Sequence, residues 1–364
     1  MRKWARVLAL VAAISLVAVA CGGDEGGGDG GGQPASFDLV TTSTGNAYVG
    51  QFHAADLFGD RFNLPTQNLT EFEDEGTAMQ VLVSDQGDVL AGALTGLLQL
   101  IQQGQNLKAF CPVQIDSTEQ LAGLTSAITS LDQITDPNIR VAVDSPGGLV
   151  NFIMNLVFHE KGMGITVSDL ENVTVLGDGS QRLAALANGD VDVGSVDLFE
   201  LPDLEKQVGA ENVTVLSVTA EDADFIANVL IAKSDWLDEN TDLATRLCAT
   251  VLYSNRVLAS DYDQYKDAVN TYIEGGVDEE IIKTNWDFAR EYSIWPYNGD
   301  VMTPEGISTF IDVAIASGLL EESARDLTFE DIVDTRPYEQ ATELIGGPVS
   351  AEDVLAGNVP EPQA

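Results

Sequence analysis

The sequence predicts an α/β fold built from two similar lobes that face each other. Short apolar runs alternate with helix-like segments from residue 36 onward, and the alternation starts again at residue 139. A local phrase also occurs twice: MQVLVSDQGDVLAGAL and QRLAALANGDVDVGSVD both give a helix, a Gly-Asp turn and a short strand that ends in small residues. Two copies are too few for a solenoid, so two facing lobes are the most economical architecture.

The first block contains four predicted strands and two predicted helices between them. Strand and helix in alternation predict parallel pairing with right-handed crossovers. The strands are FDLVTT at 37–42, NLTEFE at 68–73, VLAGAL at 89–94 and NLKAFCPV at 106–113, and the helices are NAYVGQFHAADLFG at 46–59 and GTAMQVLVS at 76–84.

The second block repeats this pattern and leads into a helical region. Strands are expected at 139–143, 172–176, 191–196 and 212–218, and helices from 149, at 180–189 and at 198–207. A return strand in ADFIANVLIAK then runs into a helix with Ser234 or Asp235 as its N-cap. Further helices are expected at 242–258, 262–275, 278–292 and 303–317, followed by a loose tail that is rich in Pro and polar residues.

The N-terminus predicts an exported, lipid-anchored chain. A basic start at Arg2, Lys3 and Arg6 precedes an apolar run at 7–19 that is too short to span a bilayer. Ala18-Val19-Ala20 followed by Cys21 resembles a bacterial lipobox, although Leu is commoner than Ala at position 18. The resemblance implies a signal peptide at 1–20 and lipidation of Cys21, whereas an ordinary secretory signal would leave Cys21 unmodified. The Gly-rich segment at 21–35 then acts as a flexible tether.

The charge of the chain is strongly negative. It has 58 Asp and Glu against 17 Lys and Arg, which gives a formal net charge of −41. This argues against nucleic acid as a partner, because binding to phosphates needs clustered basic residues. The acids are spread over a chain that is 45% hydrophobic, as on a solvated globular surface. We interpret the excess as an adaptation to high salt, where counterions screen the repulsion.

The motif DSPGG at 144–148 joins a predicted strand to a predicted helix. It lacks the lysine of a P-loop and the third glycine of a dinucleotide fingerprint, so it predicts no nucleotide site. The free N–H groups of the helix N-terminus would suit an anionic or strongly polar ligand group. The alternative is a tight turn that uses glycine for its backbone freedom and binds no ligand.

Candidates for catalysis or metal binding are few. The chain has two histidines, His53 and His159, each in or at the end of a predicted helix, and no nucleophile elbow. No Cys or His pair has the spacing of metal ligands, so no cofactor is predicted. Cys111 and Cys248 either form a disulfide, if they share a lobe, or remain as two buried thiols.

The chain contains a series of phrases in a fixed order: the lipobox, the Gly-rich tether, RVAVDSPGG, AALANGDVDVGSVD, VLIAKSDWL and TPEGISTFIDVAIASGLL with LTFEDIVDTRPYEQA. Together they resemble the ABC-transporter solute-binding proteins of the nitrate/taurine/sulfonate type, which are related to thiamine-pyrimidine synthase proteins. The resemblance implies a periplasmic-binding-protein fold with a ligand cleft and two crossovers, near 113–138 and 220–232. Lobe I would then comprise 36–113 plus 233–345, and lobe II 114–232.

The predicted ligand site follows from this architecture, since open α/β sheets bind ligands beyond the carboxyl ends of their strands. Asp197 would suit a ligand amine or ring nitrogen, and aromatic side chains could stack on the ligand or pack in the core. No basic side chain lies near these ends, although sulfonate and nitrate binders would benefit from one. The candidate residues are Ser43, Thr44, Asn46, Tyr48, Thr95, Ser145, Gly147, Gly148, Asp197 and Trp295.

Three function classes follow. The first is a monomeric lipoprotein outside the cytoplasm that delivers a small polar organic solute, such as a sulfonate, nitrate, taurine or a thiamine precursor, to the permease and ATPase of an importer. The second is an enzyme of the thiamine-pyrimidine synthase kind, which the export signal and the scarcity of His and Lys argue against. The third is a surface sensor that uses the same fold.

Overall fold

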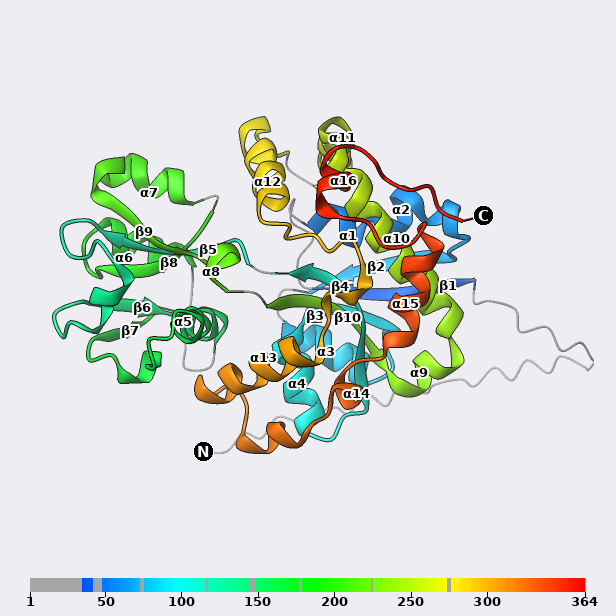
Figure 1. The fold of residues 1–364 in the computed structure, drawn as a ribbon, viewed down its shortest axis with the longest axis horizontal. Helices are drawn as coiled ribbons and strands as arrows, with labels where there is room; N and C mark the ends of the chain where they lie inside the picture. Colours follow the sequence, from blue (N-terminus) through cyan, green and yellow to red (C-terminus); the bar gives the residue numbers. More distant parts are fainter. Residues whose placement is uncertain are drawn as a thin grey trace, which may run out of the picture. The chain divides into compact units, whose positions relative to one another are not determined.

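The computed structural model contains two five-stranded sheets (Figure 1). Six residues predicted to be functional, Cys21, Ser43, Thr44, Asn46, Ser145 and Gly147, lie outside the residues that the structure describes. The described residues are 35–41, 48–72, 75–115, 117–144, 148–176, 179–198, 200–223, 225–273 and 276–363.

Sheet 1 has the strand order β2-β1-β3-β10-β4, and sheet 2 has the order β7-β6-β8-β5-β9. Both sheets follow one scheme, in which a strand that enters from the other sheet lies between the third and fourth strands of a block. This shared scheme agrees with the repeat in the sequence. Sheet 1 consists of β1 (Ser36–Thr41), β2 (Thr66–Glu71), β3 (Val89–Ala93), β4 (Leu107–Ile115) and β10 (Ile226–Lys233); sheet 2 consists of β5 (Glu119–Leu124), β6 (Val141–Val143), β7 (Val173–Val175), β8 (Val193–Asp197) and β9 (Val213–Val218).

Strands β5 and β10 pair antiparallel with both of their neighbours, which corrects the expectation of parallel pairing throughout. The reason lies in the position of the crossovers. Strand β4 ends at Ile115 and β5 begins at Glu119 opposite Asp197, the last residue of β8. A strand that enters a sheet at its carboxyl edge must run against the others, and the short connection leaves no room for the helical crossover of a parallel strand.

The pairing of β10 bears on the division into lobes. The sequence-based boundaries place 114–232 in lobe II, but β10 (Ile226–Lys233) pairs with β3 and β4 in sheet 1. The segments that connect the two sheets run from 116 to 118 and from 219 to 225. Strand β5 (Glu119–Leu124) falls in the stretch that the sequence analysis assigned to the first crossover.

Helices cover both faces of sheet 1. Helices α3 and α4 pack on one face, and α10 and α15 pack on the other (Figure 1). Helices α5 and α6 belong to the second block, between its strands. The helices are α1 (Val49–Phe52), α2 (Ala54–Phe58), α3 (Glu75–Val83), α4 (Leu94–Gln102), α5 (Leu149–Glu160), α6 (Gly179–Ala187), α7 (Leu201–Val208), α8 (Thr219–Asp222), α9 (Ser234–Glu239), α10 (Thr241–Ser260), α11 (Tyr262–Tyr272), α12 (Glu279–Glu291), α13 (Pro304–Ala316), α14 (Phe329–Ile332), α15 (Thr335–Leu344) and α16 (Ala351–Leu355).

The longest helix, α10, is almost entirely buried and holds a guanidinium in the protein interior. Arg256 is 0% exposed and donates to the carbonyl oxygens of Tyr297 at 2.8 Å, Ile345 at 2.8 Å and Gly347 at 2.9 Å, and to Asn298 Oδ1 at 2.8 Å. Burial lowers its pKa to about 10. Its fork of donors therefore ties α10 to two loops that surround it.

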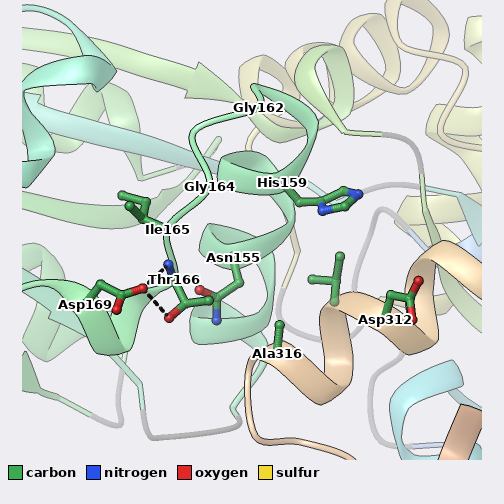
Figure 2. A pocket seen from close by; sticks show the side chains of 10 residues that line it. Asn155, His159, Gly162, Gly164, Ile165, Thr166, Asp169, Asp312 and Ala316 are labelled. Atoms are coloured by element: carbon green, nitrogen blue, oxygen red, sulfur yellow. Dashed lines mark hydrogen bonds between the residues drawn. The ribbon is translucent and has the colours of Figure 1, made fainter.

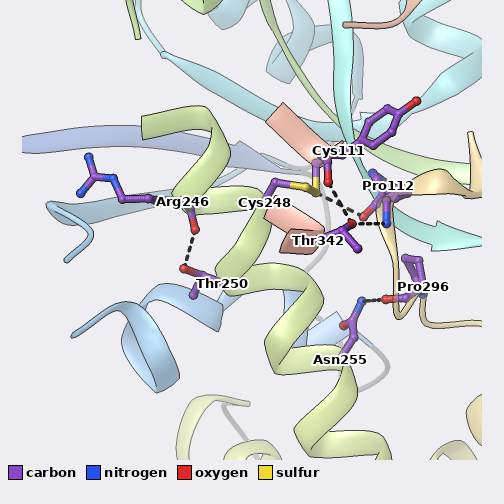
Figure 3. Close-up of a disulfide and its surroundings, with 10 residues drawn as sticks. Cys111, Pro112, Arg246, Cys248, Thr250, Asn255, Pro296 and Thr342 are labelled. Atoms are coloured by element: carbon purple, nitrogen blue, oxygen red, sulfur yellow. Dashed lines mark hydrogen bonds between the residues drawn. A yellow bond between two sulfur atoms is a disulfide. The ribbon is translucent and has the colours of Figure 1, made fainter. Parts of the chain in front are cut away.

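A disulfide joins α10 to sheet 1 (Figure 3). Cys111 of β4 and Cys248 of α10 are both 0% exposed, and their Cα atoms lie 5.5 Å apart. Of the two states that the sequence leaves open, the structure shows the bridged one. Helix α10 packs on sheet 1, so both cysteines lie in the same lobe, which is the condition that the sequence analysis set for a bridge.

The C-terminal tail is docked, which corrects the expectation that it is loose. The N–H of Gln363 donates to the carbonyl oxygen of Leu344 at 2.8 Å, and Arg61 pairs with Glu361 at 3.1 Å. Val354 of α16 is 0% exposed. These contacts with residues outside the tail hold it in place, although its composition suggests a free end.

Within the described ranges, no helix combines the length and apolar character needed to cross a bilayer.

Candidate functional site

Sheet 1 presents a group of polar side chains at its carboxyl edge. This edge carries the last residues of β3 and β4 and the first residues of β10. Gln114 lies there with only 3% exposure, and Asn228 Nδ2 donates to Gln114 Oε1 at 3.1 Å. Tyr48, just before α1, hydrogen-bonds to the side chain of Gln114. Three polar side chains therefore lie together: Gln114 from the end of β4, Asn228 from the start of β10 and Tyr48 from the residue before α1.

Sheet 2 presents two carboxylates at the corresponding edge. Glu119, the first residue of β5, lies opposite Asp197, the last residue of β8. Ser195 donates its hydroxyl to Glu119, and Thr118 donates its hydroxyl to Asp197 Oδ2 at 2.8 Å. The antiparallel entry of β5 is the cause of this arrangement, because it places the start of one strand beside the end of another.

The two edges lie close together along the chain, because β4 of sheet 1 ends at Ile115 and β5 of sheet 2 begins at Glu119. The pKa of Tyr48 is raised to about 12, mainly by burial and also by the charges of Asp197 and Glu119 from sheet 2, while the hydrogen bond with Gln114 lowers it. The hydroxyl therefore stays protonated and can donate. We call Tyr48, Gln114, Glu119, Ser195 and Asp197 the edge cluster.

Glu119 is the most perturbed carboxyl group of the edge cluster. Its pKa is raised to about 7, mainly by burial and also by the negative charges of Asp197 and Glu200. The hydroxyl of Ser195 and the guanidinium of Arg182 act in the opposite direction. A group with this pKa changes charge near neutral pH and responds to any charged ligand placed beside it.

An apolar pocket of about 330 Å³ lies at the same carboxyl edge of sheet 1. It includes the start of α4, the end of β4 and the start of β10, and the N-terminal turn of α13 closes it. A pocket of this size and character could bury the apolar part of a small ligand. The lining residues are Leu94, Ile115, Phe225, Ile226, Val301, Thr303, Gly306, Ile307 and Phe310.

The N-terminus of α5 binds a carboxylate of the chain itself. Asp144 accepts hydrogen bonds from the backbone N–H groups of Val150 at 3.1 Å and Asn151 at 3.2 Å. Gly148 makes this possible, because a Cβ at that position would lie 2.2 Å from Asp144 Oδ2. The glycine therefore permits a close approach, and the N–H groups that the sequence analysis offered to a ligand already have an acceptor.

The structure brings two of the described candidate residues together, Tyr48 and Asp197, and places three others elsewhere. Thr95 is the second residue of α4 and is partly buried. Gly148 precedes α5 beside Asp144. Trp295 is 3% exposed and packs on Tyr265 with ring centroids 5.3 Å apart, which is the core role that the sequence analysis kept as an alternative.

Sequence reasoning missed Gln114 and Glu119. They flank the first connection between the sheets, Gln114 near the end of β4 and Glu119 at the start of β5, and the sequence analysis did not predict β5 (Glu119–Leu124). The only signal in the sequence was that polar residues flank a short connection. The pairing of β5 with β8, which the sequence does not show, places Glu119 beside Asp197.

A second pocket of about 440 Å³ lies between α5 and α13 (Figure 2). Asn155, on its wall, donates to Ser317 Oγ at 2.9 Å and accepts from the N–H of Val167 at 2.7 Å. Phe152 of α5 and Phe310 of α13 also pack with centroids 4.6 Å apart. This pocket therefore belongs to a packed junction between the two helices.

Among the described residues, no group of three or more His, Cys, Asp or Glu could hold a metal ion.

Comparisons with known proteins give a consistent structural result. No family model and no curated protein matches the sequence. The periplasmic aliphatic sulphonate binding protein SsuA from Escherichia coli is similar in structure, with 15% identity, a TM-score of 0.64 and coverage of 83% of this chain and 93% of that chain. The periplasmic nitrate-binding protein NrtA from Synechocystis PCC 6803 has 14% identity, a TM-score of 0.60 and coverage of 88% and 91%.

A third similar structure is a conserved gene product of Candida albicans described as having the generic periplasmic binding protein fold. It has 12% identity, a TM-score of 0.57 and coverage of 82% of this chain and 96% of that chain. The chain therefore has the periplasmic-binding-protein fold, as the sequence predicts. At these identities the likeness establishes the fold, and the function must be argued from the site.

Proposed function

We propose that the protein is the solute-binding component of an ABC importer and acts outside the cytoplasm. The observation that supports this most directly is that the carboxyl edges of both sheets carry polar side chains, the edge cluster, and that the edge of sheet 1 also holds an apolar pocket of about 330 Å³. Open α/β sheets bind ligands at such edges. Two sheets that share one site can also close over a small solute, as hinged two-domain binding proteins do.

The proposed solute is a small polar organic molecule. The similar structures include a sulphonate binder and a nitrate binder. In this chain, hydroxyl, amide and carboxylate groups of the edge cluster would select the polar part of the solute. We propose no catalytic step, because the edge cluster has the character of a recognition surface in which the hydroxyl groups of Ser195 and Thr118 orient two carboxylates.

The proposed organisation of the mature protein begins with a lipid anchor. Cleavage after residue 20 would leave Cys21 for lipidation, and the tether at 21–35 would connect the anchor to lobe I and lobe II. The protein would then act as a monomer beside its permease and ATPase subunits. Incorporation of labelled palmitate into the native chain, and its loss in Cys21→Ala, tests the anchor.

A screen of ligands by thermal unfolding tests the binding function. The panel contains sulfonates, nitrate, amino acids, amines and thiamine precursors, and the buffer contains molar salt. A true ligand at a hundredfold excess over its dissociation constant should stabilise the protein by about 2.7 kcal/mol. Tyr48→Phe removes one hydroxyl from the edge cluster and should reduce the shift. A panel in which no compound raises the transition would show the proposal to be wrong.

Genes beside this one provide a second measurement. An importer component is expected next to genes for a permease and an ATPase, whereas a sensor that uses the same fold has no need of them. Loss of solute uptake on deletion of the gene, with uptake restored by the native chain, would support the role in import.

A further inference from the structure

A gap between two helices points to a device for closing the fold. Helix α7 packs on β9 of sheet 2, whereas α12 packs on α10 and α11, and α10 in turn packs on β4 of sheet 1. We propose that Lys206 of α7 is an electrostatic latch, which pairs with Asp278 and Glu280 at the start of α12 when the two helices approach. This inference goes beyond the proposed function, because it concerns the closing of the fold and holds for any solute.

The gap is a cavity of about 610 Å³, with α7 on one side and the start of α12 on the other. Side chains within a packed contact fill space almost as densely as molecules in a crystal, so a cavity of this size means that the two helices are not packed together here. From α7 the cavity is lined by Pro202, Asp203 and Lys206, and from the other side it is lined mainly by residues 278–281.

The charges on the two walls are complementary at Lys206. Among the described residues that line the cavity, Lys206 is the one basic side chain, and four others are acidic. Of these, Glu279 already pairs with Lys266 at 3.1 Å. Asp278 and Glu280 form no ion pair with any other described residue, and neither does Lys206. An approach of the two helices therefore brings an unpaired ammonium toward two unpaired carboxylates.

Without this cation the two helices would repel each other. Asp203 lies on the α7 side of the cavity, one turn before Lys206, and would face residues 278–280, all of them acidic. The formal net charge of −41 adds a general repulsion between the parts of the chain. Lys206 therefore supplies the attraction that offsets this repulsion.

An apolar contact would accompany the latch. Ile281 is 40% exposed, although it is a large apolar side chain, and it shares the cavity with Pro202 of α7. Closing the gap would remove both side chains from water. Farther along α12, Trp286 and Phe288 already belong to a packed cluster that includes Leu198, the residue after β8 of sheet 2. The gap is therefore a local opening beside an existing contact.

A pair of spin labels measures the distance across the fold. Asn188→Cys, directly after α6, and Asn270→Cys, on α11, place labels at exposed positions on the helices that support the two walls. With Cys21→Ser these are the only free thiols of the mature chain, because Cys111 and Cys248 form a disulfide. Pulsed electron paramagnetic resonance then gives the distribution of distances, which is divided into short and long at the median of the protein with native Lys206.

Reversal of the charge should open the gap. Lys206→Glu turns the attraction into repulsion, so the ratio of short to long distances should fall by about fivefold to tenfold. In about 1 M NaCl, where the Debye length is about 3 Å, the variant and the native protein should differ by less than about twofold. The double variant Lys206→Glu/Glu280→Lys exchanges the charges across the gap and should restore the ratio to within about twofold of the native value.

The control Arg61→Glu changes the net charge by the same amount at another place. Arg61 belongs to the 3-10 helix Gly59–Phe62, pairs with Glu361 and does not line this cavity, so the ratio should stay within about twofold. An unchanged ratio in Lys206→Glu, an equal loss in Arg61→Glu or a charge exchange without recovery would overturn the inference. None of these measurements uses a ligand, so each of these results leaves the proposed function intact, and a ligand panel without any binder leaves the latch intact.

Discussion

The pKa of Glu119 predicts a pH dependence of stability. Its value of about 7 in the folded protein lies above the ordinary 4.5, so the folded state holds the proton more tightly than the unfolded chain. The contribution to stability is fully present below pH 4.5 and is lost as the pH rises to about 7. Between pH 4.5 and about 7, the unfolding free energy of Glu119→Gln should rise relative to that of the native protein. The expected difference is on the order of 2 kcal/mol after allowance for solvent screening.

Urea unfolding at a series of pH values measures this difference. The control Ser195→Ala removes the hydrogen bond that opposes the shift, so the pH window should extend upward instead of disappearing. The charged neighbours of Glu119 are Asp197, Glu200 and Arg182. If the difference in unfolding free energy between the native protein and Glu119→Gln stayed constant from pH 4.5 to pH 8, the proton on Glu119 would not explain it.

Single residues of the site were predictable from the sequence only where they follow a recognisable strand. Asp197 ends an apolar strand, so its place at the carboxyl edge follows from the general rule. The role of Asp144 could not be predicted in the same way. Its carboxylate turns forward onto the N–H groups of Val150 and Asn151, and this contact depends on the backbone path and on the missing Cβ of Gly148.

At the scale of elements, the disulfide between β4 and α10 should contribute strongly to stability. It closes a loop between residues 137 positions apart, and a loop of this size removes much entropy from the unfolded chain. The double variant Cys111→Ala/Cys248→Ala should lose about 2–5 kcal/mol of unfolding free energy in urea. Since both sulfurs are buried, the native protein should resist reductant until urea is added. Equal stability of the two proteins would contradict this role.

Most elements agree with the sequence pattern, but the sequence analysis did not predict α4 (Leu94–Gln102), β5 (Glu119–Leu124) or α15 (Thr335–Leu344). Periodicity predicts strands such as β1 and helices such as α13, because each buries one apolar face. It fails for β5 (Glu119–Leu124), which begins with Glu and Gln and has no β-branched residue. The pairing of β5 with β8 and β9 decides its conformation, and this is tertiary information. The antiparallel direction of β10 likewise depends on tertiary structure, because it is set by the edge of sheet 1 at which the chain returns from sheet 2.

At the scale of the whole molecule, the net charge predicts that salt stabilises the fold. With 58 acidic and 17 basic residues, most carboxylates cannot have a cationic partner of their own, and they repel one another at low ionic strength. The midpoint of thermal unfolding should rise by several degrees between about 0.01 M and 0.3 M NaCl, where the Debye length shortens most. Equal osmolarity of glycerol provides the control. A midpoint that is independent of salt in this range would contradict an adaptation to saline surroundings.

The strand order of the two sheets has a consequence for how the chain assembles. Sheet 2 is complete once residue 218 is present, since β5 to β9 are continuous in the sequence. Sheet 1 is still incomplete at that point. Strand β4 is joined to β3 only through β10, whose residues 226–233 come later in the chain. The strands of the N-terminal block therefore cannot form a complete sheet until the strands of sheet 2 and then β10 have been synthesised. During synthesis the second lobe can therefore fold first, and sheet 1 is completed when β10 pairs with β3 and β4.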